Sequence, residues 1–203
     1  MELDKTGVSL VLSALGDHLE QLASEEIEIV VCGGSALQAL GLVDRTTRDV
    51  DILAFARSER AGSPTLLSAR PIPGVVRDAA RIVARDFRLP ADWLNPGPTD
   101  LLNQGLPQGL AGRLHTHRFG KSLIIHFIDR LDQICLKTYA AINGGGPRHL
   151  TDLRALDPSE DEMLMAARWC LTQDASEVFP HLVHSFLEKV GYPDVAGQLK
   201  KDS

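Results

Sequence analysis

The sequence lacks the features that mark secreted, membrane-spanning and disordered chains. Its 203 residues include 3 cysteines and 5% aromatic residues, and no apolar run approaches the ~20 residues of a membrane span. The N-terminus has no basic stretch leading into an apolar signal core. Because Cys32, Cys135 and Cys170 are far apart and odd in number, we expect buried, reduced thiols rather than disulfides or a paired zinc knuckle. A cytoplasmic protein without a membrane segment is expected.

Positive charge is also scarce. The chain has 21 Lys+Arg against 27 Asp+Glu and a formal net charge of -6, which argues against coating long nucleic acid through global electrostatics. The 44% hydrophobic and 24% charged residues are typical of globular proteins. At this length roughly 70% of the unfolded chain's surface can be buried, so the core needs neither disulfides nor a structural metal. One domain, or one domain with an appendage, is expected.

Hydrophobic periodicity predicts an α/β (α+β) fold. Residues 1–128 form a small mixed-sheet head, and residues 129–203 form a helical C-terminal region packed on that head. In the head, the patterns predict helices over 6–23, 36–40 and 74–87, and strands over 27–32, 49–54, 113–119 and 122–128. The last two strands flank Gly120-Lys121, a hairpin signal.

The remaining predictions concern two irregular stretches of the head and the helices of the C-terminal region. Residues 57–73 are rich in serine, arginine, glycine and proline and predict a loop or a short helical piece. Residues 89–112, which glycine and proline punctuate, predict a long loop with little regular structure. Four helices are predicted after the head, over 131–142, 149–156, 159–172 and 178–190, the last of these being the final helix. A capping box of Ser159 and Glu162 begins the third.

Two carboxylates mark the start of one predicted strand. Side chains alternate along a strand, so Asp49 and Asp51 project to one face, about 7 Å apart along it. Like charges held together at the start of an apolar strand are costly unless a cation neutralises them. Mg²⁺ binds through one or two carboxylates together with substrate phosphates. The pair therefore indicates a Mg²⁺ site, and the alternative is a strand-edge pair that faces solvent.

A glycine turn, Gly33-Gly34-Ser35, follows the predicted strand over 27–32. Glycines after a strand let the backbone approach a phosphate closely, and backbone N–H groups at a helix start stabilise anions. The Ser35 hydroxyl adds a further donor. A metal–triphosphate could be held between this turn and the two carboxylates, whereas the alternative is an ordinary tight turn.

The spacing of Gly33-Gly34-Ser35 and Arg45-x-Thr47-x-Asp49-x-Asp51 resembles the nucleotidyltransferase superfamily, which contains the palm of DNA polymerase beta. It is similar to abortive-infection-type nucleotidyltransferase toxins and their uncharacterised relatives. The stretch over 89–95 and the helix with Lys137, followed by Asp152, also look like a subgroup of those relatives. The resemblance covers about residues 25 to 156.

The resemblance implies that a nucleoside monophosphate passes from an NTP to a hydroxyl, with release of pyrophosphate. The acceptor it permits is a tRNA end, a protein or a small molecule. Asp49 and Asp51 would be catalytic and ligate Mg²⁺. The residues that would bind the nucleotide are Gly33, Gly34, Ser35, Arg45, Thr47 and Lys137. The alternative for Arg45 and Thr47 is a position on the surface without contact to a ligand. The alternative for Lys137 is a side chain whose stem covers apolar surface while its amine reaches water.

A third carboxylate is expected from the resemblance, on a later strand, to activate the acceptor hydroxyl. The predicted strand over 122–128 has His126 at its centre and no acid before Asp129. Asp92 and Asp129 are the remaining candidates. The alternative function is therefore a non-catalytic nucleotidyltransferase-like binding module, for instance in a toxin–antitoxin pair with an antitoxin-like partner. A dinucleotide-binding oxidoreductase is not favoured, because the glycines do not continue as Gly-x-Gly-x-x-Gly.

Four arginines recur at helical spacing in the predicted helix over 74–87 and just beyond it: Arg77, Arg81, Arg85 and Arg88. This stripe either binds RNA phosphate or forms a solvated face that is partly paired with Asp78. We favour the solvated face.

Histidines and tryptophans give weaker signals. His115, His117 and His126 do not favour a zinc site, because no third soft ligand lies at a convincing spacing. Trp93 and Trp169 are interpreted as core residues rather than as base-stacking platforms.

Overall fold

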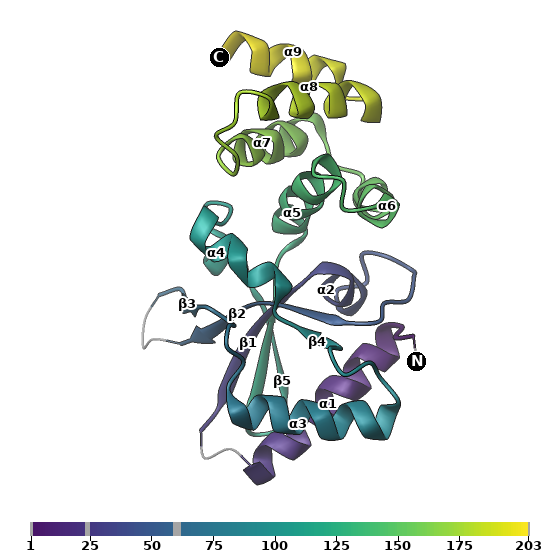
Figure 1. Cartoon of the computed structure of the whole chain (residues 1–203), viewed down its shortest axis with the longest axis vertical. Coiled ribbons are helices and arrows are strands. Elements are labelled where there is room, and N and C mark those ends of the chain that lie inside the picture. Colours follow the sequence, from purple (N-terminus) through teal and green to yellow (C-terminus); the bar gives the residue numbers. More distant parts are fainter. Residues whose placement is uncertain (1, 23–24, 59–61, 203) are drawn as a thin grey trace. The chain divides into compact units, whose positions relative to one another are not determined.

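The computed structural model describes residues 2–22, 25–58 and 62–202, and it contains two compact units, Met1–Asp129 and Arg130–Ser203 (Figure 1). The first unit combines a mixed sheet with helices, and every element described in the second unit is a helix. The predicted α+β class is confirmed. The division falls beside the predicted boundary after residue 128. Packing of the helical region on the head stays a prediction.

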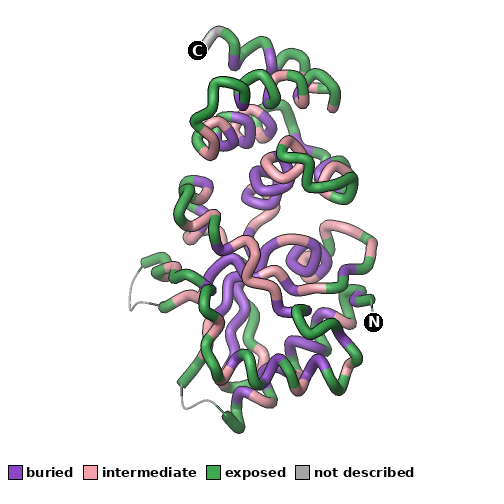
Figure 2. Tube along the Cα trace, viewed as in Figure 1, coloured by how far each residue is buried: buried purple, intermediate pink, exposed green. Residues whose placement is uncertain are grey.

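The sheet has its most buried strands at its centre. Its strands are β1 (Ile27–Cys32), β2 (Val50–Arg57), β3 (Thr65–Leu67), β4 (Leu94–Asn95), β5 (His115–Phe119) and β6 (Leu123–Phe127). The order is β3-β2-β1-β6-β5, and β4 pairs with the start of β2. Strands β1 and β6 are largely buried, whereas the edge strands β3 and β5 are mostly exposed (Figure 2).

Strand pairing determines which strand ends meet. β1 runs antiparallel to β2 and parallel to β6, and β5 and β6 form the predicted antiparallel hairpin. The end of β1 therefore lies beside the start of β2, with Cys32 opposite Asp51. The predicted strand over 27–32 is confirmed, while β3 and β4 lie in segments predicted to be loops.

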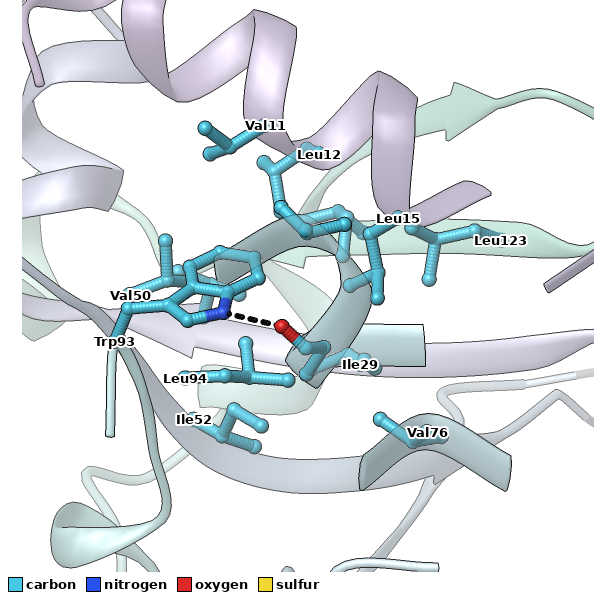
Figure 3. Packing of buried hydrophobic residues seen from close by; sticks show 14 of the residues in the cluster. Val11, Leu12, Leu15, Ile29, Val50, Ile52, Val76, Trp93, Leu94 and Leu123 are labelled. Carbon is cyan, nitrogen blue, oxygen red and sulfur yellow. Dashed lines mark hydrogen bonds between the residues drawn. The ribbon is translucent and has the colours of Figure 1, made fainter. Parts of the chain in front are cut away.

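Helices α1 (Lys5–Leu22) and α3 (Gly74–Phe87) form the main core with one face of the sheet. The buried residues of α1, among them Val8, Leu12, Leu15 and Leu19, follow the predicted helical stripe. Figure 3 shows leucines of α1 packed against Trp93 and against side chains of β1 and β2. Because β-strand side chains alternate, Ile29 and Ile52 face this core while their neighbours face the other side.

The loops of the first unit contain short elements. Helix α2 (Gly33–Ala39) begins directly after β1, earlier than the predicted 36–40. The segment after α3 holds β4 and three short helical pieces: η1 (Gly97–Asp100), α4 (Leu101–Gln104) and η2 (Leu110–Gly112). The prediction of little regular structure there is correct apart from these pieces.

The helices of the second unit are α5 (Arg130–Ile142), α6 (Pro147–Leu156), α7 (Glu160–Leu171), α8 (Phe179–Val190) and α9 (Pro193–Asp202). The prediction that the helix over 178–190 is the last was wrong. Gly191 ends α8 in the left-handed conformation, and Pro193 stands at the first position of α9, where its missing N–H costs nothing. All three cysteines are buried, as predicted, and none of them forms a disulfide within the described residues. None of the described helices combines the length and apolarity that crossing a membrane requires.

Candidate functional site

The glycine turn and Asp51 are in direct contact. Gly33 has φ +71°, and a Cβ built on it would lie 2.3 Å from Oδ2 of Asp51. The Asp51 carboxylate therefore rests against the backbone at the start of α2. The pairing of Cys32 with Asp51 in the β1–β2 ladder produces this approach. Only glycine combines this positive φ with room for the carboxylate.

The second glycine is covered by Arg45 and Thr47. A Cβ on Gly34 would lie 3.0 Å from a guanidinium nitrogen of Arg45 and 3.0 Å from Oγ1 of Thr47. Thr47 is buried, and its hydroxyl donates to Oδ1 of Asp49 at 3.1 Å. Its backbone pairs with Leu3, with N···O distances of 2.7 and 2.8 Å. The structure thus brings five residues named from the sequence pattern together around Gly33: Gly34, Arg45, Thr47, Asp49 and Asp51.

A residue that the sequence reasoning missed, Asn95, also holds Asp51. Its side-chain N–H donates to Oδ1 of Asp51 at 2.9 Å, while its carbonyl oxygen accepts from the backbone N–H of Gly97 at 2.9 Å. Strand β4 places it there by pairing with β2, which sets Asn95 opposite Asp51. A two-residue strand gives no periodicity, so the sequence did not predict β4 or its pairing with β2.

Trp93 anchors the segment that carries Asn95. Its side chain is fully buried, and its indole N–H donates to the carbonyl oxygen of Ala80 in α3 at 3.0 Å (Figure 3). The backbone N–H of Val50 in turn donates to the carbonyl oxygen of Trp93 at 2.6 Å. The interpretation of this tryptophan as a core residue is therefore correct.

A pocket of about 250 Å³ opens beside Asp49 and Asn95. Its lining residues come from the start of β2 and from the segment after α3: Arg48, Asp49, Pro90, Asp92, Trp93 and Asn95. Of the two candidates for a third carboxylate, Asp92 shares this pocket with Asp49. Asp129 lies at the end of β6 and makes a 2.9 Å contact with Nε2 of His115.

His126, at the centre of β6, belongs to a separate polar network. Its Nε2 lies 2.9 Å from Oε2 of Glu28, and its Nδ1 lies 2.9 Å from Oγ1 of Thr116. Burial alone would raise the pKa of Glu28, but hydrogen bonds from Ser58 and His126 hold that pKa below its usual value. Because an ionised carboxylate only accepts, Nε2 carries the proton of its contact with Glu28. Both nitrogens of this ring are thereby satisfied.

The oxygen donors of the site fit a hard divalent cation. Asp49 and Asp51 are partly exposed, and an amide from Asn95 stands beside them. Mg²⁺ typically takes one or two carboxylates and completes its shell with water and substrate phosphates. Within the described ranges, no group of three or more His, Cys, Asp or Glu residues is close enough to hold a metal. The carboxylates available to such a cation here are those of Asp49 and Asp51.

Two residues predicted to bind nucleotide have other partners. Ser35 is fully buried, and its hydroxyl donates to the carbonyl oxygen of Cys32 at 3.4 Å. Lys137 lies in α5 of the second unit, where its Nζ is 2.7 Å from Oδ2 of the buried Asp152. Both side chains of that ion pair are almost completely buried. The structure therefore pairs Ser35 with the end of β1 and Lys137 with Asp152.

The arginine stripe of α3 forms an exposed face. Arg81 pairs with Asp78 at 3.4 Å, and Arg85 pairs with Asp86 at 2.8 Å. The partial pairing with Asp78 agrees with the favoured interpretation, a solvated face.

Of the three histidines, His117 stacks edge-on against Phe127, at 5.5 Å between ring centroids. Trp169 is also buried, as predicted for a core residue.

In comparisons with protein-family models, with curated proteins and with solved structures, nothing matches this chain.

Proposed function

We propose that the protein is a Mg²⁺-dependent nucleotidyltransferase that moves a nucleoside monophosphate from an NTP to a hydroxyl acceptor in the cytoplasm. The observation that carries the proposal is the contact of Asp51 with Gly33, together with the Thr47–Asp49 hydrogen bond. A nucleotide's triphosphate needs acids that hold a metal and a cation that meets its charge, and Asp49, Asp51 and Arg45 supply these.

Each residue around the turn has a role in this proposal. Asp49 and Asp51 hold Mg²⁺, which when bound neutralises charge on the phosphates. Thr47 fixes the carboxylate of Asp49, and Asn95 fixes that of Asp51. Arg45, whose guanidinium covers Gly34, provides positive charge toward the triphosphate.

Asp92 is assigned the role of accepting the proton of the attacking hydroxyl. It is exposed and lines the same pocket as Asp49 and Asn95. An acceptor hydroxyl that enters this pocket comes near both the phosphates and this carboxylate, as general-base chemistry requires. The acceptor is a tRNA end, a protein or a small molecule, and the residues of the pocket favour none of the three over the others.

The test is a calorimetric titration of ATP, GTP, CTP and UTP into the protein, with and without Mg²⁺. The expected result is binding of at least one NTP that requires Mg²⁺ and is lost in the Asp49→Ala/Asp51→Ala variant. The control Asp44→Ala removes an exposed acid outside the site and should bind like wild type. Unchanged Mg²⁺-dependent binding in the double variant would refute the site.

A second candidate, a non-catalytic nucleotide-binding module of a toxin–antitoxin pair, is favoured by two observations. The described residues offer no three-acid metal group, and the position opposite Asp51 is an amide, Asn95, rather than a carboxylate. Mg²⁺-dependent NTP binding without pyrophosphate release, in the presence of tRNA, protein and small-molecule acceptors, would favour this module. Pyrophosphate release that Asp92→Asn abolishes, with NTP binding retained, would favour the enzyme.

A further inference from the structure

A groove in the second unit runs between α6 and the C-terminal half of α8. Two adjoining pockets of about 200 and about 250 Å³ form it, and both are lined by Leu150 of α6 and Val190 of α8. The first pocket continues to Tyr192, and the second continues to Phe186. The groove is thus an elongated surface with apolar residues on both walls, and it includes no residue of the Asp49–Asp51 site.

Helix α8 presents more apolar surface than its neighbours cover. Phe179, Val183 and Leu187 are buried and form its core stripe. A second row, offset by one residue, consists of Val178 and Leu182, which are 62% and 46% exposed. These residues recur every four positions, so the row continues on the same side of the helix toward Phe186 in the groove. Exposed apolar rows that lead into a groove mark protein interaction surfaces.

The rim of the groove carries unpaired positive charge. Arg154 of α6 and Lys189 of α8 line it, and neither forms an ion pair with any residue that the structure describes. One carboxylate, Asp157, lies at the Tyr192 end of the groove. In a chain with a net charge of -6, two cations beside an apolar floor are complementary to carboxylates on a partner.

We propose that this groove docks an amphipathic helix of a partner polypeptide, with an apolar stripe on the floor and acidic residues against Arg154 and Lys189. Helix α6 has 10 residues, so its wall is about 15 Å long at 1.5 Å per residue. That length matches about three turns of a docked helix, which places apolar anchors at the i, i+3/i+4 and i+7 positions. This inference is independent of the proposed nucleotidyl transfer.

The test uses two synthetic peptides of about 15 residues that share one leucine stripe and differ in flanking charge. One carries glutamates and the other carries lysines, and fluorescence anisotropy measures their binding to the full chain. The glutamate peptide should bind at least about tenfold more tightly than the lysine peptide. The Arg154→Glu/Lys189→Glu variant should reverse this preference. The control Arg148→Glu, in the same helix but outside the groove lining, should leave it unchanged.

Three outcomes would overturn the proposal. Equal binding of both peptides would mean nonspecific apolar adhesion, and no binding of either would mean that the groove does not accept a helix. Sedimentation of wild type as a dimer that the double charge reversal dissociates would assign the surface to a second copy of the chain. Circular dichroism first verifies that the double variant is folded, which is expected because its two altered side chains are exposed. The binding and sedimentation measurements follow.

Discussion

Asp51 is fixed from two directions, by a backbone and by an amide. Oδ2 lies against Gly33, and Oδ1 accepts the hydrogen bond from Asn95. A carboxylate held this way keeps one geometry before any ligand arrives, which reduces the ordering that ligand binding requires. The two contacts can be tested separately. The contact with Gly33 requires that this residue has no side chain, and the contact with Asn95 requires an amide.

At Gly33, substitution by alanine combines backbone strain with a steric clash. Gly144 is a matched control, because its φ is +72° but a Cβ there would meet nothing within 4 Å. We expect Gly144→Ala to lower the free energy of unfolding by about 1 kcal/mol, the strain of the left-handed conformation. Gly33→Ala should lower it by at least about 2 kcal/mol, because Asp51 must also move. Urea unfolding measures both, and equal losses would show that Asp51 does not press on Gly33.

At Asn95, a change to aspartate replaces a hydrogen bond with repulsion between two carboxylates. Without Mg²⁺, Asn95→Asp should lower the free energy of unfolding by about 1–2 kcal/mol. Added Mg²⁺ should restore the loss, because the variant offers the cation an additional oxygen ligand. Asn103→Asp makes the same change at an exposed position in α4 and should respond to neither condition. Thermal unfolding across a Mg²⁺ titration measures this, and a loss that Mg²⁺ does not relieve would contradict a metal site here.

Among the elements of the second unit, α7 is tied to α5 through Glu162. This residue completes the capping box, in which the Ser159 N–H donates to Oε2 at 2.9 Å, and it also pairs with Arg130 at the start of α5. The hydrogen bond from Arg130 is the main reason that the pKa of Glu162 lies below its usual value. A carboxyl with a lowered pKa in the folded state stabilises that state above its unfolded pKa and loses this effect as the pH falls through the folded pKa.

The Glu162→Gln variant isolates the ion pair, because glutamine can still complete a capping box. At pH 7 it should be less stable than wild type by about 1 kcal/mol. The difference should shrink as the pH falls below the usual range of a carboxyl pKa, where wild type also becomes protonated. Urea unfolding from pH 7 to acid measures the gap, with the exposed Glu177→Gln as control. A gap that stays constant with pH would show that the charge of Glu162 contributes nothing.

Elements with long periodic patterns could be predicted from the sequence, and those made by distant pairing could not. The stripe of α1 and the β-branched run of β1 are local signals, and both predictions were correct within a residue or two. Strand β4 has two residues and exists only because β2 lies beside it. Helix α9 was missed because a glycine followed closely by a proline, here Gly191 and Pro193, usually marks the end of a helix.

The same distinction holds for the candidate site. The grouping of Gly33, Gly34 and Asp51 follows from three elements that are consecutive along the chain, β1, α2 and β2, so spacing was enough to predict it. Asn95 required the β4 pairing and was missed. The direction of the Ser35 side chain and the partner of Lys137 depend on tertiary contacts, which neither residue's sequence neighbours specify.

For the whole molecule, each unit has a hydrophobic core of its own and one tryptophan within it. The core of the first unit contains Leu15 and Trp93. In the second unit, Trp169 packs edge-on against Tyr139, at 5.8 Å between ring centroids, and Leu187 is fully buried. Since a cooperative unfolding unit is normally built on one contiguous core, the two tryptophans are natural probes of separate transitions.

Single-tryptophan variants therefore allow each core to be followed by fluorescence during urea unfolding. In the Trp169→Phe background, Leu15→Ala should lower the stability reported by Trp93 by about 2–5 kcal/mol, the usual loss for a buried leucine. In the Trp93→Phe background, Leu187→Ala should do the same to the transition reported by Trp169, whereas Leu15→Ala should leave it nearly unchanged. If each leucine substitution shifted both transitions equally, the two units would unfold as one, because a loss in one core would then be transmitted in full to the other.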